Sequence, residues 1–371
     1  MKSPMQRALQ LARQAIGSTR PNPPVGAVIV RNNRIVAEGV TQPRGGAHAE
    51  VIALLEAGDL SKNATMFTTL EPCSYRGHTG PCVPLIVQSG ISEVHIATVD
   101  PNPLIHGAGI AALRSSGVRV RVGEEEGPAR TLMEPHFKWI TTGLPFVTAK
   151  YAMTLDGKIA TATGHSQWIS GPESRERVHR MRAESDAVVV GIGTVLQDDP
   201  QLTARDQYDR PLKNQPLKIV VDTYHRTPQE ARILKPPFPT LLAVAQNTAQ
   251  PREHADQPST QVLGFPIEDE KVNLKALLRY LGDHEVTSVL VEGGGKLLAS
   301  FFQQNLVDKV TVFLAPILLG GEIAHTPWDG KGASRIADGL RLRDVVVEHI
   351  GYDILIIGYP HKKDKSCLRE L

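Results

Sequence analysis

Short apolar runs alternate with segments of helical periodicity along the first 144 residues of the chain. Near the N-terminus, Leu9, Ala12 and Ile16 recur on one face of a predicted amphipathic helix. The apolar runs predict five strands: Gly26–Val30, Arg34–Ala37, Thr65–Leu70, Val94–Val99 and Val118–Val122. The segments between and after them predict four helices: Ala49–Ala57, Pro81–Gln88, Gly109–Ser116 and Pro128–Ile140. The first two strands meet at Asn32-Asn33, which predicts a tight hairpin.

A second alternation follows a linker at Thr141–Pro145. Its predicted strands are Phe146–Lys150, Asp186–Val190, Leu217–Asp222, Thr240–Ala245, Ser288–Glu292 and Val310–Ala315, with a terminal hairpin of Val345–His349 and Asp353–Gly358 that turns at Gly351-Tyr352. Its predicted helices are Glu173–Glu184, Thr194–Asp198, Leu274–Gly282 and Lys296–Asn305. Lys235–Pro239 and Gln246–Pro258 are predicted loops. We predict domains at residues 1–144 and 145–358, both of the mixed α/β class, and a charged tail at residues 359–371.

Composition and charge restrict the function classes. A chain of 371 residues is long enough for two domains with separate cores. The net charge of +2 gives no reason to expect a nucleic-acid partner, and no apolar run is long enough for a transmembrane helix. The first residues lack the apolar core of a signal peptide. Three Cys form no disulfide framework, which suits a cytoplasmic protein. Cys367 lies in the tail, and we assign it no function.

Candidate metal chemistry is concentrated in two segments of the first domain. His48-Ala49-Glu50 fits the H-x-E half of a zinc deaminase motif, and Pro72-Cys73 fits the start of its P-C-x-x-C half. In such a site one His and two Cys bind zinc, which lowers the pKa of water, and the Glu transfers protons. Eight residues separate Cys73 from Cys82, more than in the general motif. A closed structural zinc site is the alternative, with His78 or His95 as its fourth ligand.

Two glycine-rich segments of the second domain each follow a predicted strand and open a predicted helix. They are Gly191-Ile192-Gly193-Thr194 and Glu292-Gly293-Gly294-Gly295-Lys296. Glycine allows a backbone to approach a phosphate closely, and a helix N-terminus offers free N–H donors. Each segment alone is also compatible with a simple tight turn. The pair favours a pyrophosphate site, although neither segment is G-x-G-x-x-G.

Four motifs of the first domain resemble the deaminase half of the bifunctional riboflavin-biosynthesis deaminase/reductase, the RibD family. They are Pro21-Asn22-Pro23-Pro24-Val25-Gly26, His48-Ala49-Glu50, Thr69-Leu70-Glu71-Pro72-Cys73-Ser74 and Asp100-Pro101-Asn102-Pro103. The spacer of eight residues before Cys82 also resembles that family. The resemblance implies a cytidine-deaminase-like α/β/α domain with zinc on His48, Cys73 and Cys82, and with Glu50 as proton shuttle. It implies that Asn22, His78 and Asn102 bind a diaminopyrimidinone ribosyl phosphate, which the domain deaminates.

The second domain resembles the reductase half of the same family, whose fold is like dihydrofolate reductase. The matching motifs are Lys150–Lys158, Ser166–Ser170, Gly193–Leu196 with Asp198–Pro200, and Val291–Gly294. The resemblance implies that NADPH reduces the ribosyl group to ribityl. The implied cofactor residues are Ala152, Trp168, Ser170, Thr194, Asp198, Thr223, Gly293, Gly294, Gly295 and Lys296. The implied substrate residues are Ser166, Arg182, Leu202, Arg205 and Glu292. Arginine also suits a sugar phosphate physically, because guanidinium binds phosphate oxygens in a bidentate manner.

Three positions of the first domain depart from the family pattern. Thr41 stands where the family usually has His, and Tyr75 and His78 replace the His and the Lys or Arg of a C-S-H-x-G-[K/R]-T run. The resemblance implies that these are substrate-binding positions rather than metal positions. The two resemblances together predict a bifunctional enzyme, and they imply that it is a homodimer. The alternatives are a reductase with a weakened deaminase half, a deaminase of another nucleobase, and a non-enzymatic protein with structural zinc.

Overall fold

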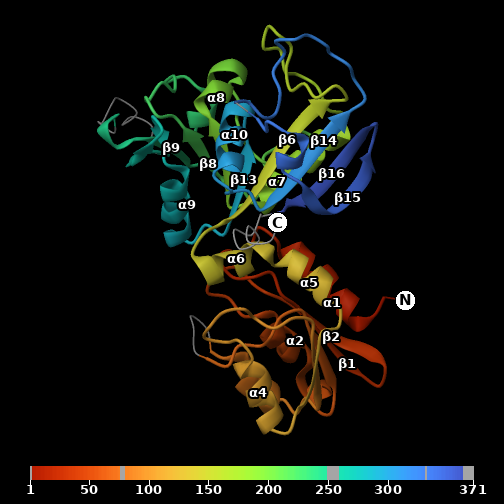
Figure 1. The fold of residues 1–371 in the computed structure, drawn as a ribbon. Helices are drawn as coiled ribbons and strands as arrows, with labels where there is room; N and C mark the ends of the chain where they lie inside the picture. The colour runs from red at the N-terminus through yellow and green to blue at the C-terminus, as the bar shows by residue number, and fades with distance from the viewer. Residues whose placement is uncertain (1, 76–79, 249–258, 331, 362–371) are drawn as a thin grey trace, which may run out of the picture. The chain divides into compact units, whose positions relative to one another are not determined.

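The chain forms two compact units in the computed structural model, which describes residues 2–75, 80–248, 259–330 and 332–361 (Figure 1). The first unit comprises Met1–Pro145 together with Gly282–Thr287. The second comprises Phe146–Leu281 together with Ser288–Leu371. Each unit builds its own sheet, so each is described by itself. The predicted tail with Cys367 lies almost wholly outside the described residues.

The first unit contains a five-stranded sheet in the order β2-β1-β3-β4-β5. Its strands are β1 (Gly26–Arg31), β2 (Arg34–Val40), β3 (Thr65–Thr68), β4 (Glu93–Ile96) and β5 (Arg119–Val122). β1 pairs antiparallel with β2 and β3, whereas β3, β4 and β5 are parallel. Asn32 and Asn33 join β1 to β2 with φ angles of 50° and 60°, as a tight hairpin turn requires. The predicted hairpin is confirmed.

Helices cover both faces of this sheet. They are α1 (Pro4–Ala15), α2 (Ala49–Ala57), α3 (Cys82–Gln88), α4 (Ala108–Ser115), α5 (Glu126–Leu132) and α6 (Glu134–Thr142), with a 3-10 turn at Gly58–Ser61. A Cβ atom on Gly26 would lie 2.0 Å from the carbonyl oxygen of Ala8 in α1, and one on Gly39 would lie 2.0 Å from that of Ala49 in α2. Gly39 pairs with Ala27 rather than with Gly26, so the two glycines face opposite sides. They let α1 and α2 approach the two faces closely.

Two helix predictions in this unit need correction. The helix predicted over Pro128–Ile140 is wrong as a single element, because α5 ends at Leu132 and α6 begins at Glu134. Pro135 lies in the first turn of α6 and has no N–H to continue the preceding helix. Ile16 was placed on the face of the N-terminal helix, but α1 ends at Ala15 and Ile16 is its C-cap residue. The buried face of α1 does include Leu9 and Ala12.

The second unit contains a nine-stranded sheet in the order β10-β9-β8-β7-β13-β6-β14-β16-β15. Its strands are β6 (Phe146–Thr154), β7 (Ala187–Gly191), β8 (Leu217–Val221), β9 (Thr240–Ala245), β10 (Thr260–Phe265), β13 (Ser288–Glu292), β14 (Lys309–Ala315), β15 (Leu342–Ile350) and β16 (Asp353–Pro360). The strands from β10 to β14 in that order are parallel, and β16 and β15 add an antiparallel edge. β10 and the short pair β11 (Ile267–Glu268) and β12 (Lys271–Val272) were not predicted.

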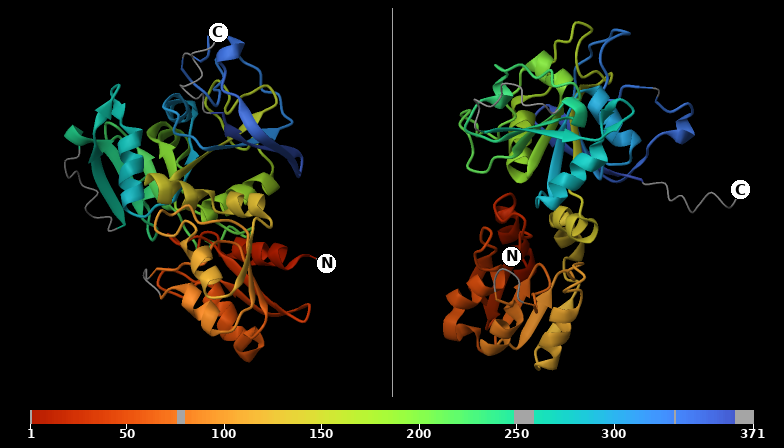
Figure 2. Two further views of the ribbon diagram at one scale, coloured as in Figure 1. Left: turned by 60° about the horizontal axis from the view of Figure 1, so that its bottom comes forward. Right: turned by 90° about the vertical axis from the view of Figure 1, so that its left-hand side faces the viewer.

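Helices also pack on both faces of this larger sheet (Figure 2). They are α7 (Pro172–Glu184), α8 (Ile192–Asp198), α9 (Leu274–Asp283) and α10 (Gly295–Gln303), with 3-10 turns at Arg232–Leu234, Gln246–Thr248 and Ile336–Asp338. Val195 of α8 belongs to the core cluster that contains Val188 and Val190 of β7. Gly191 points to the opposite face, where a Cβ atom would lie 3.5 Å from Leu297 of α10. Among the described residues, no helix is long and apolar enough to cross a membrane.

Candidate active sites

A cluster of one His and two Cys lies at the start of two helices in the first unit. His48 is the N-cap residue of α2 and Cys82 is the first residue of α3. The Nδ1 atom of His48 lies 3.2 Å from Sγ of Cys82 and 3.5 Å from Sγ of Cys73. The backbone N–H groups of Cys82 and Val83 donate to the carbonyl of Cys73, which holds the two Cys segments together. The three ligand atoms all lie within 4.8 Å of one another.

The electrostatics of this cluster suit a metal. The hydrogen bond from Cys82, assisted by His48, lowers the pKa of Cys73 to about 4. The same bond and burial raise the pKa of Cys82, because its thiol donates to the neighbouring thiolate. One imidazole and two sulfur ligands with a fourth position left free are the donor set of a catalytic zinc site. The residues present therefore fit zinc.

The surroundings of the cluster bear on the alternative of a closed structural site. His95 was one candidate for a fourth ligand, but its Nδ1 lies 3.0 Å from Glu124 and its Nε2 lies 3.2 Å from Glu93. His95 is thus committed elsewhere, and a closed site that uses it is wrong. His78, the other candidate, lies outside the described residues. Glu50 lies in the first turn of α2, and its carboxylate is 3.7 Å from Sγ of Cys82. Burial raises the pKa of Glu50 to about 6.

A cavity of about 230 Å³ opens beside the cluster. His48, Glu50 and Cys73 lie in its wall, together with Asn22 and Asn102, two of the predicted substrate residues. Two of the positions that depart from the family pattern, Thr41 and Tyr75, also line it. The structure therefore brings the predicted metal, proton-transfer and substrate residues of the first unit together around one cavity, with His78 left outside the description.

The two glycine-rich turns of the second unit meet at the carboxyl ends of adjacent parallel strands. β7 leads into α8 and β13 leads into α10, and the N–H of Gly294 donates to Oγ1 of Thr194 at 3.2 Å. A Cβ atom on Gly193 would have nothing within 4 Å, so open space lies beside the first turn. The helix α10 begins at Gly295, and Lys296 is the second residue of its first turn. This arrangement suits a pyrophosphate, because ligands bind outside the carboxyl ends of parallel strands.

The other predicted cofactor residues occupy several places in the same unit. Ser166 donates a hydrogen bond of 2.8 Å to Asp198, and Ala152 lies in β6. Trp168 is 68% exposed, with the guanidinium of Arg175 4.7 Å from its ring centre, and Arg175 also donates to the carbonyl of Ser170. Thr223 makes its hydrogen bonds with residues outside the predicted cofactor set. Its hydroxyl accepts one from the N–H of Val272, and its carbonyl accepts one from the N–H of Ala245.

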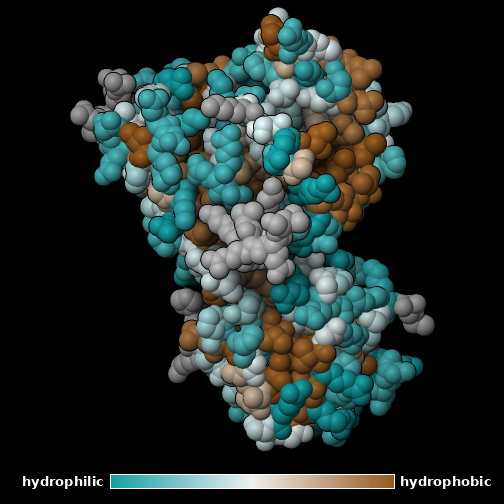
Figure 3. All heavy atoms as spheres, in the orientation of Figure 1, coloured by the Kyte–Doolittle hydropathy of each residue, from teal (hydrophilic) through white to brown (hydrophobic). Residues whose placement is uncertain are grey.

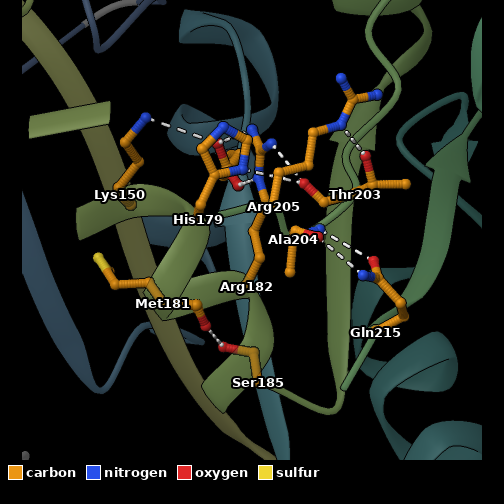
Figure 4. Close-up of polar contacts among 10 residues, drawn as sticks. Lys150, His179, Met181, Arg182, Ser185, Thr203, Ala204, Arg205 and Gln215 are labelled. Atoms are coloured by element: carbon orange, nitrogen blue, oxygen red, sulfur yellow. Dashed lines mark hydrogen bonds and ion pairs between the residues drawn. The ribbon is translucent and has the colours of Figure 1, made fainter. Parts of the chain in front are cut away.

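A buried ion-pair network involves two predicted substrate residues, Arg182 and Glu292. Arg182 donates to both carboxylate oxygens of Glu292, at 2.6 and 3.0 Å. Lys150 lies 3.5 Å from the same carboxylate, and Figure 4 shows its side chain pointing into this network. Arg182 and Lys150 hold the pKa of Glu292 at about 2 against the opposing effect of burial. Two cations face one anion here, so the network keeps a positive excess.

Thr203 joins this network to the remaining substrate candidates. Its carbonyl accepts from Arg182 at 3.2 Å and from His179 at 3.1 Å, and its hydroxyl accepts from Arg205 at 2.8 Å (Figure 4). Leu202 precedes it with a φ of 53° and is buried. Of the predicted substrate residues, Arg182, Leu202, Arg205 and Glu292 are therefore gathered by one segment, whereas Ser166 bonds to the predicted cofactor residue Asp198.

Comparisons with known proteins agree with this two-part organisation. Residues 1–98 match the model of the cytidine and deoxycytidylate deaminase zinc-binding region, and residues 145–356 match that of the RibD C-terminal domain. The riboflavin biosynthesis protein RibD of Aquifex aeolicus is 40% identical over 358 residues, which cover 96% of this chain and 97% of that protein. The chain belongs to the RibD family.

Solved structures of RibD proteins have the same fold. RibD of Acinetobacter baumannii superposes with a TM-score of 0.86 at 35% identity, covering 97% of this chain and 98% of that one. A deaminase/reductase structure from Thermotoga maritima gives a TM-score of 0.84 at 35% identity, covering 96% and 98%. The expected fold class, a deaminase-like domain followed by a reductase domain, is confirmed. Membership of the RibD family makes this chain a bifunctional deaminase/reductase of riboflavin biosynthesis.

The structure also places residues at both sites to which the sequence had assigned no individual role. Lys150 pairs directly with Glu292 in the register of β6 and β13, and His179 lies three residues before Arg182 on α7. Residues three apart on a helix are neighbours, so the predicted helix could have linked His179 to Arg182 from the sequence alone. His136 and Trp139 of α6 line the deaminase cavity. No sequence motif marked these two residues, because α6 follows the last strand of its sheet and shares no motif with the metal residues.

Proposed function

We propose that this chain catalyses two consecutive reactions at separate sites. The first unit removes an amino group from the diaminopyrimidinone ribosyl phosphate by hydrolysis and releases ammonia. The second unit then reduces the ribosyl group of that product to ribityl with NADPH. The observation that carries the first assignment is the cavity in which Glu50 lies beside His48, Cys73 and Cys82. A purely structural zinc site needs no buried carboxylate at that position.

In the deaminase, zinc held by His48, Cys73 and Cys82 would supply Lewis-acid activation of water. Glu50 takes up a proton and returns it to the departing amine. Its carboxylate, buried in the first turn of α2 beside Cys82, is placed to accept and release this proton. Asn22 and Asn102 in the cavity wall orient the uncharged ring through their amide groups.

Removing zinc with a chelator should abolish deamination and leave reduction unchanged. The three ligands belong to the first unit, whereas the reductase residues belong to the second, which has its own core. Ammonia release from the diaminopyrimidinone phosphate and NADPH oxidation with supplied aminouracil phosphate would be measured before and after chelation. Readdition of zinc should restore deamination. Full deamination by the metal-free protein would refute the role of the cluster.

In the reductase, NADPH would supply the hydride. The turns at Thr194 and Gly294 would hold its pyrophosphate through backbone N–H groups. The positive excess of Lys150 and Arg182 around Glu292, with Arg205 nearby on Thr203, would bind the substrate phosphate. Glu292 fixes the guanidinium of Arg182 in a single orientation by its two hydrogen bonds.

The substitution Gly294→Val should weaken NADPH binding without unfolding the second unit. A Cβ atom at Gly294 would lie 3.6 Å from Oγ1 of Thr194, an ordinary contact, so the fold can accommodate it. The branched side chain would however occupy the space needed by a closely approaching pyrophosphate. We expect the dissociation constant of NADPH to rise at least about tenfold, equal to about 1.4 kcal/mol. Fluorescence titration with NADPH measures it, and unchanged affinity in a folded variant would remove this turn from the cofactor site.

We also propose that the protein is cytoplasmic. We further propose that it forms a homodimer through the edge strand β15. Figure 3 shows apolar side chains gathered over this edge of the second unit. Val345, Val346 and Val347 are 49%, 49% and 60% exposed. A second copy would cover such an apolar edge, which would otherwise favour uncontrolled association. Sedimentation of the purified chain as a monomer would refute the dimer.

A further inference from the structure

Glu71 is a buried carboxylate in the wall of the deaminase cavity, and neither reaction assigns it a role. It stands two residues before Cys73 and is only 3% exposed. Its Oε2 atom accepts hydrogen bonds from the backbone N–H groups of Asp100 at 3.3 Å and Gly107 at 3.0 Å. Its Oε1 atom accepts one from the N–H of Ile110 at 3.1 Å. An ionised carboxylate offers only acceptors, which matches these three donors.

The three hydrogen bonds join the metal-binding segment to loop 100–107, which connects β4 to α4, and to the start of α4 itself. Two of the donors are the first and last residues of this loop, and the last, Gly107, is the N-cap residue of α4. A Cβ atom on Gly109 would lie 2.1 Å from the carbonyl oxygen of Pro72, so α4 packs directly against the same segment. Loop 100–107 therefore cannot shift relative to this segment without breaking the hydrogen bonds of Glu71.

The predicted substrate residue Asn102 is built into this loop. Its N–H donates to Oδ1 of Asp100 at 2.8 Å, and its carbonyl accepts from the N–H groups of Ile105 and His106. The N–H of Leu104 donates to Oδ1 of the Asn102 side chain at 3.0 Å. This last bond identifies the oxygen of the amide and thereby fixes the side on which its NH2 group can donate. The orientation of the Asn102 amide thus depends on the conformation of the loop.

We propose that Glu71 is a positioning residue of the deaminase, which holds Asn102 in the orientation that substrate binding requires. It is placed to do so because it belongs to the same short segment as the metal ligand Cys73 and bonds both ends of the loop that carries Asn102. The inference rests on the deaminase function proposed above, in which Asn102 orients the uncharged ring. Misplacement of a substrate-positioning group by about 1 Å can cost an enzyme about 100-fold.

The variant Glu71→Gln tests this role, because it keeps the size of the side chain but replaces one acceptor oxygen with an NH2 donor. Either the N–H of Ile110 or the two N–H groups of the loop then face a donor instead of an acceptor. We expect the KM for deamination to rise at least about tenfold while kcat falls less, since Glu50 and the metal ligands are untouched. Zinc content and the reduction of supplied aminouracil phosphate should match the wild type.

A double-mutant cycle with Asn102→Ala shows whether Glu71 acts through Asn102. The single variant Asn102→Ala should itself raise the KM, because the amide is lost. In that background Glu71→Gln should raise the KM by less than about twofold, since the residue that it positions is already gone. Two increases that multiply would show that Glu71 acts independently of Asn102, and would overturn the proposal.

Arg114→Met is the matched control for a general disturbance of α4. Arg114 is exposed near the end of this helix, and its guanidinium donates to the carbonyl of Val120 at 3.4 Å. Its loss removes a contact of α4 without touching loop 100–107, so the KM for deamination should stay at the wild-type value. An equal rise of the KM in Arg114→Met and Glu71→Gln would refute the positioning role.

The outcomes separate this inference from the function on which it rests. A wild-type protein that releases no ammonia would overturn the proposed deaminase and the inference with it. Normal wild-type deamination with an unchanged KM in Glu71→Gln would overturn the inference alone, as a purely structural carboxylate predicts. Should Glu71→Gln fail to bind zinc, a crystal structure of the wild type with the deaminated product decides. An Asn102 amide within about 3.2 Å of the product, with Glu71 still bonded to the loop, supports the proposal. A product that Asn102 does not contact, or that Glu71 contacts directly, refutes it.

Discussion

Glu50→Gln is expected to stop deamination while zinc binding and reduction continue. The substitution keeps the size of the side chain and leaves the ligands His48, Cys73 and Cys82 unchanged. It removes the group that exchanges protons with the substrate, and loss of such a group typically lowers a rate by about 100- to 10,000-fold. Ammonia release measures the first reaction, and NADPH oxidation with supplied aminouracil phosphate measures the second. Zinc would be quantified in the same preparation.

Glu56→Gln is the matched control for this experiment. Glu56 lies on the same helix, α2, but is exposed, and its carboxylate accepts a hydrogen bond from the N–H of Glu38. Its loss should leave both activities near those of the wild type. Deamination at the wild-type rate in Glu50→Gln would refute the assignment of Glu50 as the group that transfers protons. Loss of zinc in that variant would instead show that Glu50 is needed to hold the metal site together.

Arg182→Met is expected to destabilise the second unit and to impair reduction. The variant leaves the carboxylate of Glu292, whose side chain is only 9% exposed, with Lys150 at 3.5 Å as its remaining ion-pair partner. Removing one partner of a buried ion pair typically costs about 3–5 kcal/mol of stability. The substrate phosphate would also lose a guanidinium, so KM for reduction should rise. Calorimetry and reductase kinetics measure the two effects.

The difference in stability between the wild type and Arg182→Met should depend on pH because of the pKa of Glu292. The folded protein holds that pKa at about 2, below its ordinary value of 4.5, so the ion pair stabilises the fold fully above pH 4.5. The contribution is lost as the pH falls toward 2, so the stability gap between the wild type and Arg182→Met should narrow below pH 4.5. Arg180→Met is the control, because Arg180 is 58% exposed and pairs with Glu176 one turn away, worth about 0.5 kcal/mol or less. An equal loss of stability in both variants would contradict the buried network.

Much of the fold could be predicted because its elements carry local signals. The strands around the metal site are short apolar runs, and the pattern places His48 just before α2 and Cys82 at the start of α3, although it begins α3 one residue early, at Pro81. The motifs then identified several of the residues that line the first cavity, among them His48, Glu50 and Cys73. The order of the strands, the pairing of β13 with both β6 and β7, and the edge strand β10 depend on long-range contacts, which no local pattern contains.

The residues that the sequence did not reveal are those whose roles depend on tertiary contacts. Lys150 was noticed only as part of a motif, and its position beside Glu292 depends on the register of two strands that are distant in the chain. His136 follows a helix break at Met133 that the apolar pattern concealed, and its place in the cavity wall is visible only in the folded structure. The roles of the predicted site residues remain predictions that the variants above would test.

The central claim, that one chain deaminates and then reduces the same molecule, is tested most directly by identifying the products made from the diaminopyrimidinone ribosyl phosphate. The zinc-loaded wild-type protein would be incubated with this substrate, with and without NADPH, and the products followed by mass spectrometry. Without NADPH we expect ammonia and the deaminated aminouracil with its ribosyl group intact. With NADPH we expect the ribityl product and consumption of one NADPH for each ammonia released. Reduction of the substrate without prior deamination, or no ammonia in either reaction, would contradict this account.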